Sequence, residues 1–325
     1  EMASSGFSAS CFGKLPGFGD FVRHNAGSRE MLAFDQWLQQ GMLAAKAQLR
    51  QSWEADYDAA PIQHFLFCPT NTEHFLAGLL QPSHDKSDRR YPFWVSWLIE
   101  RSYYNENLAA HTPVILASRL SSARQLMQNA RTELNTNNLT GMISNLSFPG
   151  TQDSEREVEL YNKYLGATAC ANFWQSLFDD FNDLRKYLLC KNLCEILLPF
   201  RQARLDELKL GLRFPLSADA ESAAYGVSFW IQMSLELARN SSFTPIYFWN
   251  LPEPGRKAFL FLFFRPPSAK SFVQLLRPEI ASDGICELDE EGRDKIILAE
   301  QVLPSLYRGL LQRPALTLKE FLQRL

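Results

Sequence analysis

Residues 91–100 read Tyr-Pro-Phe-Trp-Val-Ser-Trp-Leu-Ile-Glu, and this strand-like stretch decides the fold that the sequence predicts. Two similar stretches precede it, residues 63–68 with His-Phe-Leu-Phe at the centre and residues 73–80. Pro69, Thr70 and Asn71 separate the first two stretches and are typical turn residues. Such a short connection predicts an antiparallel meander of three strands.

Helical patterns surround this meander. Ser28 is a good N-cap, and the residues behind it place Phe34, Trp37 and Leu38 at helical spacing, which predicts an amphipathic helix running to residue 53. Residues 114–134 also have a helical pattern, and the pattern from 153 to about 204 is helical throughout. Residues 136–150 are rich in Asn, Thr, Ser and Gly, so we predict a surface loop or boundary there.

The last part of the chain returns to a mixed pattern. We expect strands at residues 208–216, 244–249 and 258–265, and helices at 218–239, 268–276, 290–312 and 316–325. Short extended segments are also expected on both sides of a turn at Gly17 and Gly19, at least one of which we expect to have a positive φ.

These patterns predict a mixed α/β (α+β) fold with one or more predominantly antiparallel sheets flanked by helices. We expect three parts along the chain: an N-terminal α/β domain at 7–134, a helical segment at 135–205 and a C-terminal α/β part at 206–325. The first and third parts can pack together as one body.

Composition excludes several classes of protein. The 325 residues carry a net charge of -3, without the basic surplus with which nucleic-acid-binding proteins neutralise phosphates. The longest apolar run, residues 258–264, is far shorter than the roughly 20 residues of a membrane-spanning helix. No basic region followed by an apolar stretch opens the chain, so we expect no signal peptide and a cytoplasmic protein.

Cysteine and histidine give little sign of a metal site. Cys190 and Cys194 are four residues apart and would share a helix face, which could be half of a site. No His follows Cys194, and no motif such as HxH or HExxH unites the five His residues. We therefore expect reduced, partly buried thiols, no metal and no cofactor.

Two segments could carry chemistry. Residues 13–20, Gly-Lys-Leu-Pro-Gly-Phe-Gly-Asp, fail as a phosphate-binding loop because Lys14 comes early and Asp20 follows the last glycine. In the polar loop at 82–92, Ser83, His84 and Asp85 have the composition of a catalytic triad, but three adjacent side chains rarely converge. This loop is interpreted as structural or as a recognition surface, and a hydrolase or phosphate-handling enzyme is the alternative function.

Together these segments resemble the ImpM/TagF family of bacterial type VI secretion. Residues 12–23 are similar to the family's GKLP–GDF opening, residues 34–42 to its W-x-x-W-L-like helix, and 82–92 to its P-S-x-D-x-x-G-R-x-[FY]-P motif. A weaker similarity lies at 245–249 with 259–263. Asp88 stands where the family usually has Gly. The residues that match the motifs are Gly13, Lys14, Leu15, Pro16, Gly19, Asp20, Phe21, Trp37, Pro82, Ser83, Asp85, Arg89 and Pro92.

The resemblance implies a non-enzymatic accessory or regulatory protein that acts by protein–protein binding. Some family members control type VI secretion post-translationally by engaging a forkhead-associated (FHA) scaffold protein, and some are fused to a PP2C-type phosphatase, which here would be a separate partner. A structural subunit of the apparatus is a further alternative. Arg23 and Arg90 are the candidate partner-binding residues. We expect Asp85 and Arg89 to be structural and at least partly buried, and Arg90 to be exposed.

Overall fold

The computed structural model describes residues 7–70, 72–103 and 109–325, and its strands form a nine-stranded sheet in the order β2-β1-β5-β4-β3-β7-β8-β6-β9. Neighbouring strands are antiparallel except for β6 and β9, which are parallel. The predicted mixed fold with a predominantly antiparallel sheet is therefore confirmed. The strands are β1 (Ala9–Gly13), β2 (Val22–His24), β3 (Gln63–Phe67), β4 (His74–Gln81), β5 (Phe93–Glu100), β6 (Gly211–Pro215), β7 (Ile246–Trp249), β8 (Phe259–Phe263) and β9 (Ile285–Glu287).

The predicted meander forms the centre of the N-terminal half of the sheet. β4 pairs with β3 on one side and with β5 on the other, and Leu80 lies opposite Trp94 in the register. β3 is buried along its whole length. Trp94 and Trp97 point to opposite faces of β5, and both are fully buried. Burial on both faces requires helices on both sides of the sheet.

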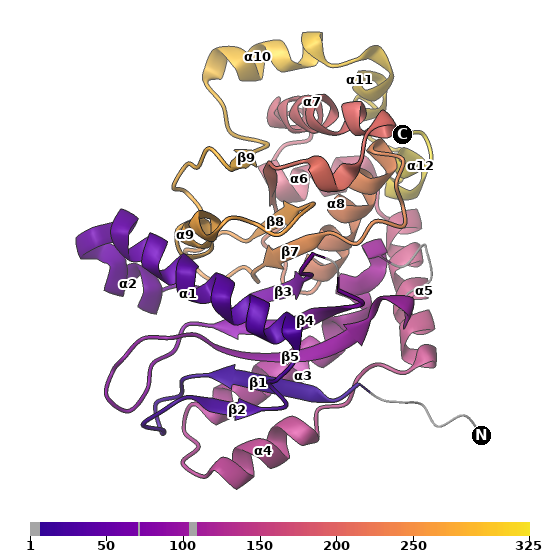
Figure 1. The fold of residues 1–325 in the computed structure, drawn as a ribbon. Helices are drawn as coiled ribbons and strands as arrows, with labels where there is room; N and C mark the ends of the chain where they lie inside the picture. Colours follow the sequence, from indigo (N-terminus) through magenta and orange to yellow (C-terminus); the bar gives the residue numbers. More distant parts are fainter. Residues whose placement is uncertain (1–6, 71, 104–108) are drawn as a thin grey trace.

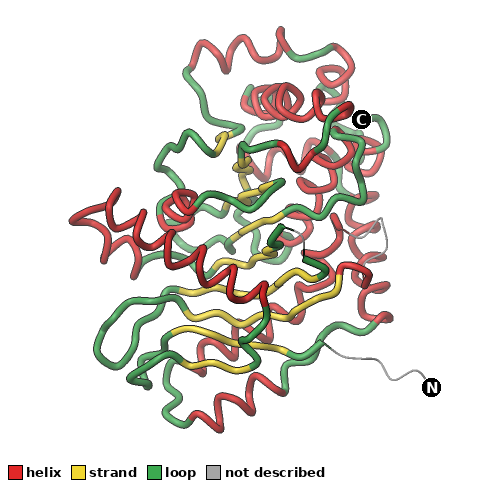
Figure 2. Tube along the Cα trace, viewed as in Figure 1, coloured by secondary structure: helices red, strands yellow, loops and turns green. Residues whose placement is uncertain are grey.

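Helices cover both faces. α1 crosses in front of the sheet and α3 lies behind it (Figure 1), and both contact β4. The coloured trace shows the remaining helices gathered mainly around the C-terminal strands (Figure 2). The α-helices are α1 (Arg29–Leu49), α2 (Trp53–Asp58), α3 (Thr112–Ala130), α4 (Thr136–Ser144), α5 (Thr151–Ala167), α6 (Cys170–Phe178), α7 (Arg185–Leu197), α8 (Ala223–Leu237), α9 (Phe272–Leu276), α10 (Arg293–Val302), α11 (Ser305–Leu311) and α12 (Leu318–Leu322).

The sheet passes without a break from the N-terminal to the C-terminal half of the chain. β3 pairs with β7, which places Phe65 opposite Phe248. Trp37 of α1 stacks on Phe248 with the ring centroids 5.3 Å apart, and its Nε1 donates to the Pro267 carbonyl at 2.9 Å. The motif residue Trp37 therefore has a packing role across the two halves.

Three sequence predictions are corrected. Residues 136–150 do not form only a loop, because α4 occupies Thr136–Ser144; the Asn135 side chain caps it, and Leu139 and Ile143 are buried. The single helix predicted at 290–312 is two helices, since Pro304 separates α10 from α11. The sequence also gave no sign of β9, which has only three residues and is stabilised by parallel pairing with β6.

Candidate functional site

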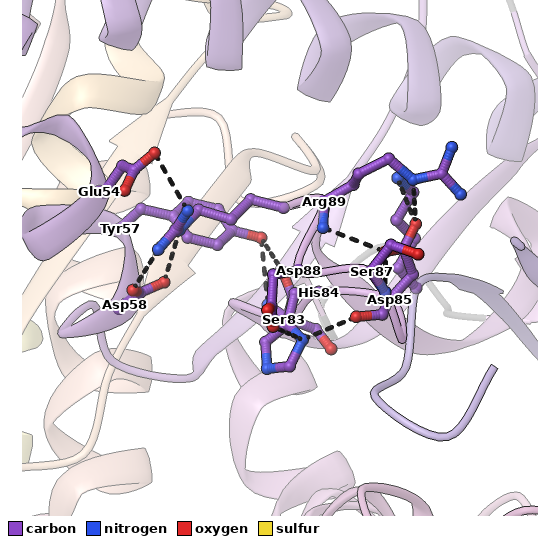
Figure 3. A network of polar contacts seen from close by, with 11 residues as sticks. Glu54, Tyr57, Asp58, Ser83, His84, Asp85, Ser87, Asp88 and Arg89 are labelled. Atoms are coloured by element: carbon purple, nitrogen blue, oxygen red, sulfur yellow. Dashed lines mark hydrogen bonds and ion pairs between the residues drawn. The ribbon is translucent and has the colours of Figure 1, made fainter. Parts of the chain in front are cut away.

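Asp85 is the centre of a buried polar cluster that joins the two predicted motif segments. Its side chain is fully buried, and its Oδ2 lies 3.0 Å from the Lys14 Nζ and 2.7 Å from the Arg89 Nε. The other oxygen, Oδ1, accepts the backbone N–H groups of Ser87 at 2.9 Å and Arg89 at 3.0 Å. Figure 3 shows Ser87 and Arg89 around this carboxylate. We call Gly13, Lys14, Phe21, Asp85, Arg89 and Pro92 the motif cluster.

The electrostatic balance at Asp85 keeps the carboxylate charged. Burial alone would raise its pKa, but hydrogen bonds from the Lys14 ammonium, from the two backbone N–H groups and from the Arg89 side chain outweigh burial and lower the pKa below the usual range. A carboxylate whose lone pairs are occupied in this way holds a loop in place. It is poorly suited to take up a proton from a substrate.

The loop turns sharply at Asp88. The N–H of Asp88 donates to the Asp85 carbonyl at 3.0 Å, and the N–H of Asp85 donates to the Arg89 carbonyl at 3.2 Å. Asp88 adopts a φ of 58°, in the left-handed region that favours glycine. Asp88, which stands where the motif that the sequence resembles usually has Gly, keeps the turn because Asp tolerates this region better than most residues.

Gly13 brings the first motif segment against the second. It ends β1, where it pairs with Phe93, and it has a φ of 131°. A Cβ atom at this position would lie 2.0 Å from the Pro92 carbonyl oxygen, so only glycine allows this approach. Beside it, the Lys14 ammonium lies 5.1 Å from the centroid of the Phe21 ring, which adds a cation–π contact.

The prediction for the glycine turn is wrong in its conformation. Neither Gly17 nor Gly19 has a positive φ. Gly17 is required for a different reason, since a Cβ there would lie 2.2 Å from the Glu133 carbonyl oxygen. A Cβ on Gly19 would meet nothing within 4 Å. The turn therefore depends on a close backbone approach to the segment that follows α3.

The exposures predicted for Arg89 and Arg90 are reversed, whereas the burial of Asp85 is as expected. The Arg89 side chain is 62% exposed, although its Nη2 also donates to the Gly19 carbonyl at 2.8 Å. Arg90 is only 23% exposed because α2 supplies two acids: Asp58 accepts its Nε and Nη2 at 2.9 and 2.8 Å, and Glu54 lies 3.2 Å from Nη1. Arg90 therefore connects the loop to α2.

Ser83 and His84 do not meet as a nucleophile and its base. The Ser83 side chain is buried, and its Oγ has no hydrogen-bond partner among the described residues. His84 instead donates from Nδ1 to the Asp85 carbonyl at 2.9 Å. The backbone of Ser83 is held by Tyr57, whose hydroxyl donates to the Ser83 carbonyl at 2.9 Å and accepts the Ser83 N–H at 3.1 Å.

The other predicted site residues have local structural contacts. Leu15 is fully buried, and its carbonyl accepts the N–H of Phe18 at 3.1 Å. Asp20 is exposed and accepts the N–H of Phe21 at 2.7 Å. Pro16 and Pro82 are partly exposed. Arg23 is exposed on the edge strand β2, with its guanidinium 5.8 Å from the centroid of the Phe12 ring.

Sequence reasoning missed the partners of the motif residues. Lys14 and Asp85 are 71 positions apart, and Tyr57 lies outside both motifs. The only sign of the Lys14–Asp85 pair in the sequence was that each charged residue lies in a segment rich in turn residues. Nothing in the sequence pointed to Tyr57, because its role depends on how α2 packs under the loop.

The described part of the chain shows neither a metal centre nor a membrane span. No group of three or more His, Cys, Asp or Glu side chains within it is placed to hold a metal ion, and Cys190 and Cys194 are both buried on α7. None of the described helices combines the length and apolar character needed to cross a membrane.

Comparisons with known proteins agree with this structure. Residues 10–146 match the family of the TagF N-terminal domain, described as type VI secretion system-associated. A search of curated proteins finds no match. A crystal structure of PA0076 from Pseudomonas aeruginosa PAO1 has a similar fold, with a TM-score of 0.52 and 17% identity over 85% of this chain and 96% of that chain. Residues 10–146 of this chain therefore carry a TagF N-terminal domain, the type VI secretion system-associated domain that the sequence motifs resemble.

Proposed function

We propose that this chain is a cytoplasmic accessory or regulatory protein of a bacterial type VI secretion system and that it acts by binding another protein rather than by catalysis. The match of residues 10–146 to the type VI secretion system-associated TagF N-terminal domain supports the link to secretion. The observation that carries the binding role is the state of the 82–92 loop. The Asp85 carboxylate is occupied by four donors, and the Ser83 hydroxyl is buried away from His84.

The outer side of the motif cluster is the surface that we assign to the partner. Arg89 has a mostly exposed guanidinium that Asp85 and Gly19 hold in a fixed position. Arg23 is exposed on β2, at the edge of the sheet. Fixed arginines lose less side-chain entropy on binding than free ones and suit bidentate pairing with carboxylate or phosphate groups.

The proposed partner is an FHA-domain scaffold protein of the same secretion system, through which the chain would control assembly post-translationally. The resemblance to family members that engage such a scaffold motivates this choice, and a separate PP2C-type phosphatase would belong to the same pathway. An FHA domain presents its own basic phosphopeptide site, so the contact proposed here involves a different, acidic surface of the scaffold.

A pull-down with the purified scaffold tests the binding surface. We expect the parent chain to retain the scaffold and Arg23→Glu to weaken retention by about tenfold, because the substitution places a like charge against an acidic surface. Lys257→Glu is the matched control, since Lys257 is an exposed cation on the other half of the chain with no ion pair among the described residues.

Ser83→Ala separates this function from the enzymatic alternative. The Ser83 hydroxyl is buried without a partner, so removing it should leave both stability and scaffold retention unchanged within about 0.5 kcal/mol. Ester or phosphoester hydrolysis by the parent chain that Ser83→Ala abolishes would establish the hydrolase reading instead. Equal scaffold retention by the Arg23→Glu variant would place the partner elsewhere on the surface.

A further inference from the structure

A basic cleft of about 980 Å³ lies at one end of the sheet, away from the motif cluster. Its wall is formed by the segments that follow β3, β5 and β8 and by the segments that precede β6 and β7. Four cations line it, Arg101, Arg204, Lys209 and Arg265, against two acids, Asp206 and Glu207. The volume is within the range of small-ligand and peptide sites.

Two of these cations form no ion pair of their own. Asp206 is occupied by Arg204, whose Nε lies 3.0 Å from its Oδ1. Lys209 and Arg265 are exposed and make no ion pair or side-chain hydrogen bond with any described residue. β6 and β8 are antiparallel, with Leu212 opposite Leu262, so Lys209 before β6 and Arg265 after β8 lie at the same end of this strand pair.

Like charges that lie close together repel each other. Lys209 and Arg265 also line a second, adjoining cleft of about 380 Å³ together, which agrees with their juxtaposition. The cleft therefore carries a positive potential that its two acids, Asp206 and Glu207, offset only in part. A dianion would remove the repulsion and gain charge-assisted hydrogen bonds from both.

The surroundings of the cation pair define the ligand further. The aromatic rings of Phe243 and Phe264, whose centroids are 5.9 Å apart, belong to the same cleft and offer an apolar wall. Ser242 and Thr244 bring hydroxyl groups. Arg101 is fixed in this wall, because its Nε donates to the Thr72 carbonyl at 2.8 Å and its Nη2 contacts the Cys68 sulfur.

From this geometry we infer that the cleft binds a phosphate monoester carrying an apolar or aromatic group, with Lys209 and Arg265 on the phosphate. A phosphate monoester is close to a dianion at neutral pH and has three strong acceptor oxygens. Such a group can belong to a phosphorylated side chain in a protein segment or to a free nucleotide. The site is separate from the surface assigned to the scaffold, so it does not depend on that assignment.

Isothermal titration calorimetry of the full chain in phosphate-free buffer tests this inference. The probes are a peptide library centred on phosphothreonine, the same library with threonine, and AMP. We expect phosphothreonine peptides or AMP to bind at least tenfold more tightly than the threonine peptides, and the probe that binds identifies the source of the phosphate. Binding by neither phosphate probe overturns the inference.

The Lys209→Gln/Arg265→Gln variant tests the assignment of the two residues. It should lose at least about tenfold in affinity for the phosphate probe, because each substitution removes a charge-assisted contact. Without ligand, its melting temperature should equal or exceed that of the parent, since the repulsion is gone. Lys257→Gln is the control and should bind like the parent. Unchanged binding by the double variant, or a lower melting temperature, overturns the assignment.

Discussion

Replacing Asp85 by Ala tests whether the motif cluster holds the fold together. The change leaves the Lys14 ammonium, whose side chain is only 10% exposed, without its counter-charge, and it orphans the N–H groups of Ser87 and Arg89. Removing one partner of a buried ion pair costs about 3–5 kcal/mol. Because Arg89 beside it is largely exposed, water can reach part of the site, and we expect about 3 kcal/mol.

The expected loss is large enough to measure by thermal unfolding. Unfolding entropies of roughly 2 cal/mol/K per residue give about 0.7 kcal/mol/K for the 325 residues. A loss of about 3 kcal/mol then lowers Tm by about 4 °C. Asp88→Asn is the control in the same loop, since this side chain is 89% exposed and Asn also tolerates the left-handed backbone, so Tm should change by less than about 1 °C.

Two further measurements separate the ion pair from simple loss of packing. Lys14→Met added to Asp85→Ala should recover part of the stability, because no buried charge remains unpaired. Since the pKa of Asp85 is lowered by folding, its contribution is complete above about pH 5 and falls as the pH drops below the unfolded value of about 3.9. An Asp85→Ala protein as stable as the parent that no longer binds the scaffold would refute the structural role.

Three other predictions follow from particular contacts. Gly17→Ala should lower the free energy of unfolding, measured by chemical denaturation, by about 1–3 kcal/mol, because its Cβ would press on the Glu133 carbonyl oxygen. Gly19→Ala should lower it by less than about 0.5 kcal/mol, and equal losses would contradict the close approach at Gly17. Burial, and then the charge of Arg124, lower the pKa of His64 to about 3. The free energy of unfolding of the parent should therefore fall as the pH drops below about 6.5, by up to about 1.4 kcal/mol per pH unit. In urea titrations at several pH values, His64→Phe should lose most of this slope. Asp88→Gly should raise the free energy of unfolding by about 0.5 kcal/mol because it relieves a left-handed backbone, and a decrease would contradict the strain.

Apolar patterns predicted the sheet and most helices because burial in this chain follows local sequence. The stretches around Phe65, Leu76 and Trp94 became buried strands as expected. The loop prediction at 136–150 failed because several Asn residues disfavour helix formation on average, yet Asn135 is used as a cap and α4 packs through Leu139 and Ile143.

The candidate site was predicted as a set of residues but not as an arrangement. Family motifs pointed to Lys14, Asp85 and Arg89, whereas their pairing depends on β1 and β5 lying side by side, a contact between distant segments. The exposures of Arg89 and Arg90 were assigned the wrong way round because the acids of α2 that hold Arg90 are far away in the sequence. Local pattern cannot show such partners.

Secretion by the native host is the most direct test of the central claim that this chain serves type VI secretion by binding a partner. The gene is deleted and then complemented with a tagged copy of the parent or of Arg23→Glu. Protein secreted through the type VI system is measured in the culture medium, and the scaffold bound to the tagged chain is measured by pull-down. We predict that deletion changes secretion, that the parent restores it with bound scaffold, and that Arg23→Glu does neither. Unchanged secretion after deletion, or full restoration by a variant that binds no partner, would contradict the claim.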